Sequence, residues 1–485
     1  MDEHGTNALP LANDRNVLDY HRLSTHGRMS LPYLFIWLAI VAFGLLMMFS
    51  ASYGISFVQS SSAMRAQLRE AGLLDPNSPV GEILAADASA LARKQAFFTL
   101  LGVFLGLMVA GLFKFRVFSR RIYSITVYFV VTIGLVYCAM FGRVINGARR
   151  WIDLGFTTFQ PSELAKVGAV FVLAAYLSRR RMIRRRNPQK KPLWRRALLD
   201  VTLPACLMIV WIVLVALQPH LSGAIILTMV CFCIFFLADI PWKSWMMGIA
   251  EILLIVIVLG AVAGWGYQKA TGNSAVEFVE QRFAHAYRRV GTHQDRDAVS
   301  EDDRMQIEQA EIALGSGGWT GKGIGRGVQK LNWLSEAHND FILPVIGEEL
   351  GFVGVMAVIL LYLVFLLAGL NIARRAATHM AMLVAAGYTL LITIQAFLNM
   401  AVATSLIPAT GISLPFLSYG GTSNFFFALA CGMVLCVSKS ATVRDRELSR
   451  VLDGRDGRRN AVPPPVLLER EERVAIDYRR MSSSM

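Results

Sequence analysis

The sequence is short of charged residues for its length. Charged residues make up 17% of the 485 residues, whereas soluble proteins carry about 25%. Hydrophobic residues account for 55%, and several apolar runs reach the roughly 20 residues that cross a bilayer as a helix. This composition excludes a soluble multi-domain protein and indicates a polytopic membrane protein.

Acidic residues are the scarcer kind of charge. The chain has 48 Lys and Arg against 34 Asp and Glu, which leaves a formal net charge of +14. In a soluble protein such an excess would suggest nucleic acid as a partner. Here the basic residues cluster in loops between apolar runs, which indicates membrane topology and contact with anionic lipids instead. We therefore expect membrane lipids, and no nucleic acid, as partners.

The six cysteines lack metal-binding or redox spacing. Cys231 and Cys233 are two residues apart, and none of the six has a His or Cys partner at zinc spacing. All lie within or at the edge of apolar runs, so we interpret them as small apolar packing residues.

The apolar runs predict an all-α membrane domain with ten transmembrane helices. The expected spans cover about 32–53, 94–113, 122–141, 161–177, 198–217, 221–239, 246–266, 341–371, 380–404 and 420–438. A long outer loop, 267–340, separates the seventh span from the eighth. We divide the chain into a cytoplasmic segment (1–30), the membrane domain (31–438) and a disordered cytoplasmic tail (439–485).

The basic loops set the expected orientation. The loops 114–121, 179–196 and 374–375 are rich in Lys and Arg, and all three fall on the cytoplasmic side when both termini are cytoplasmic. The loop 179–196 is either an orientation signal or a site for anionic lipid or a cytoplasmic partner. Loop 54–93, with its acidic residues, then lies on the outer face.

The outer loop 267–340 contains two recognisable segments. Ser300 to Asp303 resembles a capping box and predicts a helix over about 301–314. The segment 315–327 (GSGGWTGKGIGRG) is rich in glycine but has neither a Walker nor a Rossmann pattern. Two interpretations stay open for it, a flexible surface loop and a set of backbone amides that cradle a phosphate.

Charged residues gather where the fourth span begins. Glu163 and Lys166 are three residues apart and therefore share a helix face. They either pair to fix helix packing or face a cavity. Arg149 and Arg150, which precede Trp151, either bind phosphate through bidentate contacts or anchor the chain at the interface.

A second polar cluster lies immediately before the eighth span. The segment 334–351 (LSEAHNDFILPVIGEELG) contains Glu336, His338 and Asp340. Asp340 is our candidate catalytic residue at the outer membrane surface. Its alternative role is the helix N-cap of the span, where its carboxylate would accept backbone N–H bonds. His338 is either a further site residue or a simple interfacial residue.

Two glutamates continue this cluster into the eighth span. Glu348 and Glu349 lie about two turns inside it, where a charge is costly. At least one should therefore face an internal polar cavity or a cationic partner such as Lys166.

The segment 406–423 (LIPATGISLPFLSYGGTS) cannot form a regular helix because it contains two prolines and three glycines. Irregular backbone at membrane depth is tolerated only where it is buried in protein or lines water. We expect a re-entrant or interfacial loop beside the polar clusters, with Ser418 and Tyr419 as candidate site residues. A tight outer connector is the alternative.

These stretches together resemble the SEDS family of bacterial cell-envelope proteins, the FtsW, RodA and SpoVE group. The resemblance covers roughly residues 30–440, and the ten-span count agrees with it. The motifs that carry it are GARRWIDLG and QPSELAK within 147–166, GSGG and GKG within 315–323, EAHNDFI and GEELGFVG within 336–354, and PATGISLPFLSYGGTS at 408–423.

The resemblance implies polymerisation of lipid II into glycan strands at the outer face of the cytoplasmic membrane. It also implies a class B penicillin-binding protein as partner, with other divisome or elongasome proteins. The family's essential aspartate corresponds to Asp340, and its Arg-Trp pair to Arg150 and Trp151. The residue before Asp340 departs from the family pattern, since it is Asn339 rather than Thr. At His220 many members have an aspartate, so we assign that position no role.

The chemistry can be stated in physical terms. An acceptor hydroxyl attacks the anomeric carbon of a lipid-diphosphate donor, with Asp340 as general base and inversion at that carbon. Cations stabilise the departing diphosphate, and we expect a divalent cation (Mg²⁺ or Mn²⁺) whose ligands are unassigned. The expected substrate-binding residues are Arg149, Arg150, Trp151, Glu163, Lys166, His338, Ser418 and Tyr419.

Two other functions stay open on the sequence. One is a lipid II flippase, which would use the intramembrane charges as a path. The other is a non-catalytic scaffold that recruits a penicillin-binding protein. The polar residues gather near the outer ends of the spans, which favours the enzyme. The sequence TGISLPF at 410–416 favours a role in cell division over one in cell elongation or sporulation.

Overall fold

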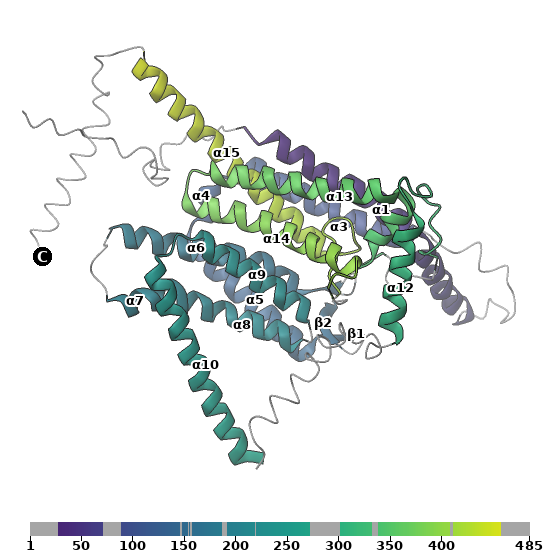
Figure 1. Cartoon of the computed structure of the whole chain (residues 1–485), viewed down its shortest axis with the longest axis horizontal. Helices are drawn as coiled ribbons and strands as arrows, with labels where there is room; N and C mark the ends of the chain where they lie inside the picture. Colours follow the sequence, from purple (N-terminus) through teal and green to yellow (C-terminus); the bar gives the residue numbers. More distant parts are fainter. Residues whose placement is uncertain are drawn as a thin grey trace, which may run out of the picture.

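The protein is a long bundle of helices in the computed structural model (Figure 1). The structure describes residues 28–70, 89–145, 148–153, 155, 158–186, 192–218, 220–271, 301–331, 338–407 and 411–456. The helices are α1 (Leu31–Glu70), α3 (Ala90–Leu112), α4 (Phe115–Phe118), α5 (Arg121–Phe141), α6 (Pro161–Arg186), α7 (Leu193–Ala197), η1 (Leu198–Thr202), α8 (Leu203–Leu217), α9 (Leu221–Leu237), α10 (Trp242–Thr271), α12 (Glu301–Ser316), α13 (Ile342–Arg374), α14 (His379–Ala403) and α15 (Thr422–Asp456).

Each of the ten predicted spans falls on one of these helical segments. Eight segments of the described chain are long and apolar enough to cross a membrane. The other two predicted spans, 221–239 and 246–266, coincide with α9, a shorter apolar helix, and α10. The structure is therefore that of a multi-pass membrane protein with mostly helical architecture. The predicted helix at 301–314 is present as α12.

A small sheet corrects the all-α prediction. Strands β1 (Arg143–Ile145), β2 (Ala148–Asp153) and β3 (Thr158–Phe159) form an antiparallel sheet in the order β1-β2-β3. The sheet connects α5 to α6, where the sequence suggested only a loop. Its strands pair with near neighbours in the chain, with Ile145 opposite Ala148 and Ile152 opposite Phe159. Such short hairpins are easily missed, because two to six residues carry too little alternation to be recognised.

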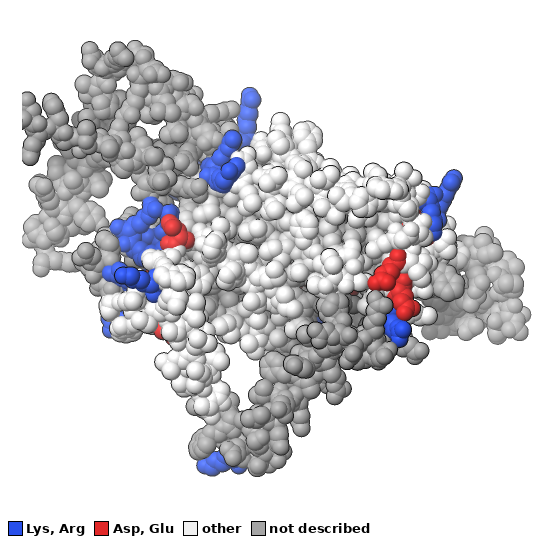
Figure 2. All heavy atoms as spheres, viewed as in Figure 1, with Lys and Arg blue, Asp and Glu red and all other residues white. Residues whose placement is uncertain are grey.

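The core of the bundle is formed by α6, α9, α13, α14 and α15, which pack together. Helix α14 is buried over most of its length, because residues of nearly every face are covered by neighbours. On the face shown in Figure 2, the charged residues of the described chain lie mostly towards the two ends of the long axis, and the described surface between them is largely uncharged. This distribution matches a bilayer around the middle of the bundle.

Two helices depart from a simple bundle. Helix α10 contacts α7 and η1 and then extends away from the other helices (Figure 1). Helix α13 is interrupted at Gly351, which has φ 67° and ψ −166°. Such a conformation strongly favours glycine. The outer piece of α13, residues 342–350 before the break, lies against the glycine-rich segment 315–327.

The last helix is longer than the sequence suggested. Helix α15 continues from the membrane domain to Asp456. The predicted tail from 439 onwards therefore begins as helix. Residues 1–27 and 457–485 lie outside the described residues, as does Glu336.

Candidate functional site

A cavity of about 570 Å³ opens where α3, α6, α9 and α14 meet the small sheet and the irregular loop before α15. Its walls carry both charges and hydrogen-bonding groups. The lining residues are Lys94, Arg150, Trp151, Thr158, Gln160, Glu163, Lys166, His220, Ser222, Gly223, Ile226, Asn339, Asp340, Gln395, Gly411, Ile412, Ser413, Tyr419, Gly420, Gly421, Thr422 and Ser423. The cavity is therefore a polar recess bordered by residues from most of the chain.

The predicted pair at the start of α6 forms one wall. Lys166 Nζ lies 2.8 Å from Glu163 Oε2, and both side chains are almost fully buried. The same ammonium donates to Gln395 Oε1 at 2.6 Å and lies 5.6 Å from the centre of the Phe427 ring. Both interpretations of the pair are thus met, since it is an ion pair that also borders a cavity.

Asp340 lies on the rim of the same cavity. Its backbone oxygen accepts a hydrogen bond from Asn399 Nδ2 at 2.8 Å, and the same amide donates to Ile412 O at 2.6 Å. Asn399 thereby ties the turn before α13 to the irregular loop. The N-cap position of α13 is Phe341, without a side-chain capping bond. The N-cap position, which was the alternative role of Asp340, thus falls one residue later, and Asp340 itself lines the cavity.

The irregular loop after α14 is held by buried polar side chains. Gln95 of α3 donates to Ser418 O at 3.1 Å and accepts from Gly421 N at 2.9 Å. Asn424 accepts from Phe416 N at 2.8 Å and donates to Ser418 O at 3.1 Å. The described part of the loop, from 411 onwards, is thus irregular backbone with its hydrogen bonds satisfied inside the protein. It lies beside the polar clusters, as we expected.

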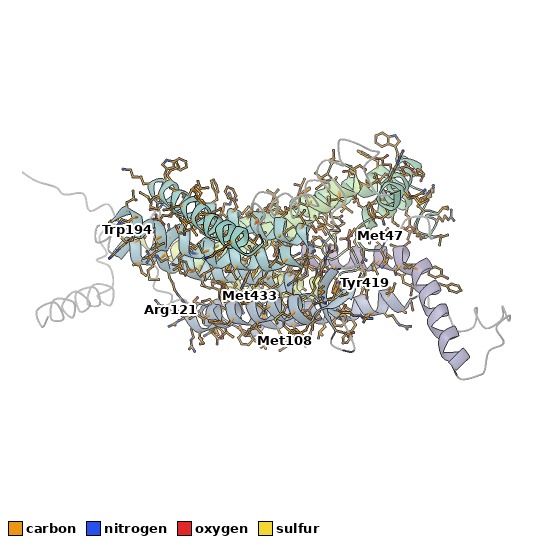
Figure 3. The ribbon with its side chains drawn as sticks, turned by 90° about the horizontal axis from the view of Figure 1, so that it is seen from below. Met47, Met108, Arg121, Trp194, Tyr419 and Met433 are labelled. Atoms are coloured by element: carbon orange, nitrogen blue, oxygen red, sulfur yellow. The ribbon has the colours of Figure 1, made fainter. Side chains whose placement is uncertain are left out.

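The two predicted residues of this loop have different surroundings. Ser418 is fully buried, does not line the cavity, and its Oγ accepts from Leu414 N at 2.8 Å. Tyr419 lines the cavity, and burial raises the pKa of its hydroxyl. Tyr419 lies towards one end of the bundle, and Trp194 lies at the other (Figure 3). Ser418 thus supports the loop, whereas Tyr419 faces the recess.

The predicted site residues of β2 also have different surroundings. Arg150 and Trp151 line the cavity. Arg149 is exposed and donates from Nη1 to Met140 O at 3.1 Å, which suits an anchor at the end of α5. His338 lies behind Tyr419: its carbonyl accepts from Tyr419 N at 2.8 Å, and the two ring centres are 5.7 Å apart.

Several lining residues were missed by the sequence analysis. Lys94, in the first turns of α3, adds a cation from a helix with no assigned role. A charged residue at the start of an apolar run was the available signal. Gln160 and His220 face each other, with 3.4 Å between Nε2 atoms, and Gln395 binds Lys166. Burial, with Lys166 and Arg150 nearby, lowers the pKa of His220 to about 3, so its imidazole is neutral at physiological pH.

The two glutamates of α13 find cationic partners, but neither partner is Lys166. Glu348 pairs with Lys322 at 2.8 Å and accepts from Val328 N at 2.9 Å. Glu349 pairs with Lys330 at 2.5 Å and accepts from Ser50 Oγ at 2.7 Å. Both carboxylates are fully buried. The prediction of a cationic partner is confirmed, and the suggested identity of that partner is wrong.

The glycine-rich segment packs against α13. Lys322 N and Gly323 N donate to the carbonyls of Glu348 and Glu349, at 3.0 and 2.9 Å. A side chain at Gly321 would lie 2.2 Å from Glu349 O, so only glycine permits this approach. These two amides are used within the protein, whereas most residues of the segment are exposed, as in a surface loop. Phosphate binding by the segment stays a prediction.

The described residues offer no complete metal site of their own, because no three His, Cys, Asp or Glu side chains gather among them. The cavity has two carboxylates, and Glu163 is paired with Lys166. Mg²⁺ is commonly bound by one or two carboxylates together with substrate phosphates. The carboxylates of the cavity are therefore too few to hold such an ion without further ligands.

The sequence and fold were compared with known proteins. The FtsW/RodA/SpoVE cell cycle protein family matches residues 80–443. A probable peptidoglycan glycosyltransferase FtsW of Saccharophagus degradans is 30% identical over 73% of this chain and 84% of its own length. One from Geobacter sp. is 33% identical over 71% and 86%, respectively. The peptidoglycan glycosyltransferase MrdB of Escherichia coli K12 is 30% identical over 64% and 76%.

Solved structures show the same fold. A chain from a peptidoglycan synthase complex superposes with a TM-score of 0.54 over 85% of this chain and 98% of its own, at 23% identity. A variant of the rod shape determining protein RodA of Thermus thermophilus gives 0.52 over 86% and 98%, at 25% identity. The family match covers most of the membrane domain and includes every element around the cavity. The chain therefore belongs to the FtsW/RodA/SpoVE family.

Proposed function

We propose that the protein is a peptidoglycan glycosyltransferase that joins lipid II units into glycan strands at the outer face of the cytoplasmic membrane. The observation that carries this proposal is the position of Asp340, on the rim of a cavity that also contains Lys94, Arg150 and Lys166. A carboxylate beside three cations suits attack by a hydroxyl with departure of a diphosphate. The related FtsW and MrdB proteins carry the same activity in their names.

Asp340 serves as the general base in this scheme. It removes the proton from the acceptor sugar hydroxyl as the oxygen attacks the anomeric carbon. The Asn399 bridge to the backbone of Asp340 and Ile412 holds the turn in place, so that the carboxylate is positioned before substrate arrives. A single base and direct displacement give inversion at the donor carbon.

The cations serve the leaving group. The bond from the anomeric carbon to the diphosphate oxygen breaks, and negative charge grows on that diphosphate. Fixed cations in a recess stabilise such a charge without needing to reorganise. Lys94 and Arg150 contact the diphosphate, and Lys166, held by Glu163 and Gln395, contributes its field. A Mg²⁺ or Mn²⁺ ion held mainly by the substrate's phosphates would add positive charge at the same place.

The shape of the site favours this enzyme over a flippase. A translocation path needs polar groups that continue to the opposite membrane face. Along α6 the residues after Lys166, from 167 to 177, are apolar except for Tyr176, and most are buried in the core. Along α6, the polar groups of the cavity therefore end at Lys166.

The related proteins support a proposal about the partners and the cellular role of this protein. A related chain acts within a peptidoglycan synthase complex that couples polymerisation and crosslinking. We propose a class B penicillin-binding protein as the crosslinking partner here, with other divisome proteins around it. The FtsW relatives and the TGISLPF wording at 410–416 support a division role. Both termini are cytoplasmic in this proposal, since the arginine-rich ends of α6 and α7 then face inwards.

The test is polymerisation of labelled lipid II by the full chain in detergent, with Mg²⁺ and a class B partner. We expect Asp340→Asn, which keeps shape and removes the base, to slow polymerisation by about 10²–10⁴-fold. Lipid II binding should be retained. The matched control is Asp153→Asn, a carboxylate on β2 that pairs with Arg143 outside the cavity.

Equal activity of wild type and Asp340→Asn, with both proteins folded, would remove Asp340 from the chemistry. No glycan strands from wild type, with the partner present, would remove the enzyme proposal itself.

A further inference from the structure

A second recess lies at the other end of the bundle from the cavity. Its volume is about 490 Å³, and it is formed by the end of α6, the end of α9 with the following turn, and the start of α14. Fifteen residues of α6 separate Lys166 from Arg181, which corresponds to about 22 Å along a helix. The lining residues are Arg181, Arg185, Phe236, Leu237, Asp239, His379 and Met382.

Arg181 is a buried guanidinium with donor capacity left over. Its Nε and Nη2 donate to Asp239 Oδ2, at 3.0 and 2.7 Å. Its Nη1 is also buried, yet no acceptor for it exists among the described residues. A buried donor without an acceptor is unfavourable, and most such groups in proteins are satisfied. The recess is thus lined by a guanidinium that keeps one buried nitrogen without an acceptor among the described residues.

The recess also has an excess of positive charge. Arg180 and Arg184 both pair with Asp200, at 2.7 and 2.9 Å. Hydrogen bonds from Arg181 lower the pKa of Asp239, so that carboxylate stays ionised. Among the lining residues, the two arginines (181 and 185) against Asp239 leave a formal surplus of one positive charge. Lys and Arg gather at this end of the molecule (Figure 2).

Apolar surface continues from the recess along the outside of α9. Phe236 lines the recess and is 75% exposed, and Phe232, one turn earlier, is 62% exposed. Residues four apart lie on one helix face. The ligand that suits this place therefore has an anionic head for the arginines and a hydrocarbon chain for the two rings.

We propose that this recess binds the phosphate headgroup of an anionic phospholipid from the leaflet opposite the catalytic cavity. Arg181 and Arg185 contact the phosphate oxygens, and an acyl chain lies along Phe236 and Phe232. The arginine-rich end of α6 is then a lipid site with a defined pocket, in addition to an orientation signal. The site is independent of the glycosyltransferase proposal.

The experiment is native mass spectrometry of the full chain in detergent, titrated with phosphatidylglycerol and, separately, with phosphatidylcholine. Wild type should bind one phosphatidylglycerol in preference to phosphatidylcholine. Arg185→Gln should weaken phosphatidylglycerol binding by about fivefold, as expected for one cation near an anionic headgroup. The matched control is Arg195→Gln, which removes an arginine that stacks on Trp194 and does not line the recess.

A second variant keeps every charge. Met382→Trp places a larger side chain in the recess, so phosphatidylglycerol binding should fall although the arginines remain. Equal losses in Arg185→Gln and Arg195→Gln would show diffuse attraction and overturn the proposal. Unchanged binding in Met382→Trp would do the same. Displacement of the lipid by millimolar glycerol 1-phosphate would also overturn it, because it would assign the recess to a soluble phosphate.

Discussion

Two buried Glu–Lys pairs in this molecule have different surroundings. Glu163 and Lys166 border an open cavity, whereas Glu349 and Lys330 are enclosed, with Ser50 as a shared partner. Both pairs lie near the predicted edge of hydrocarbon, where isolated charges are costly. A charged side chain near the hydrocarbon edge thus indicates an oppositely charged residue beside it. A cavity next to such a pair indicates, in addition, a place where a ligand binds.

The enclosed pair belongs to a structural joint. It fixes the glycine-rich segment and α1 to the outer piece of α13, whose first residue follows Phe341 and Asp340. The open pair belongs to the cavity wall. We therefore expect changes in the enclosed pair to affect stability and changes in the open pair to affect the rate.

The largest effect on stability is expected for Lys330→Met. Removal of one partner leaves Glu349 as a buried charge, which should lower the free energy of unfolding by about 3–5 kcal/mol. Denaturant unfolding in detergent measures it. The double variant Lys330→Met with Glu349→Met should recover most of the loss, since no buried charge remains. If the double variant is as unstable as Lys330→Met alone, the loss of stability does not come from an unpaired buried Glu349.

The next effect is on rate, at Lys166. Lys166→Met should reduce lipid II polymerisation by about 10²–10³-fold, because a fixed cation near the leaving group is lost. Lys166→Arg should retain part of the activity. Polymerisation per folded molecule is the measurement, with Lys330→Met as the comparison. The distinction between the two pairs fails if both methionine variants lower specific activity equally.

A smaller effect on stability is expected at the break in α13. Gly351→Ala should destabilise the protein by about 1–3 kcal/mol, because alanine disfavours a positive φ. The new Cβ would also lie 2.4 Å from Gly321 N. Thermal unfolding of the full chain is suitable. Gly111→Ala is the control, since nothing lies within 4 Å of its added Cβ. Equal melting temperatures for the two variants would exclude a tight joint at Gly351.

The smallest effect concerns His220 and pH. Its pKa is about 3 in the folded protein and about 6.5 when unfolded. The unfolded state therefore binds more protons between these values, and stability falls as pH decreases from about 6.5, by about 1.4 kcal/mol per pH unit at most. In His220→Gln, the free energy of unfolding should therefore depend less on pH between pH 6.5 and 5.5. A variant with the wild-type slope would show that folding does not lower the pKa of His220.

The sequence alone was sufficient where local patterns decide structure. Apolar runs located every predicted span on a helix, because each helix buries its own backbone polar groups in a bilayer whatever its neighbours are. Asp340, Arg150, Trp151, Glu163, Lys166 and Tyr419 were all predicted as site residues, and the cavity brings them together. Charges beside hydrocarbon were the signal that identified most of them.

The tertiary structure decided which groups meet. Ser50 and Glu349 are 299 residues apart, and Gln95 and Ser418 are 323 apart. No periodicity reports such contacts. The roles of Lys94, Ser418 and Arg149 followed only from whether each side chain reached the cavity. Hydropathy predicts that a residue lies at the membrane edge. Which residue it pairs with, and whether it borders a cavity, depend on how helices that are distant in the sequence pack together.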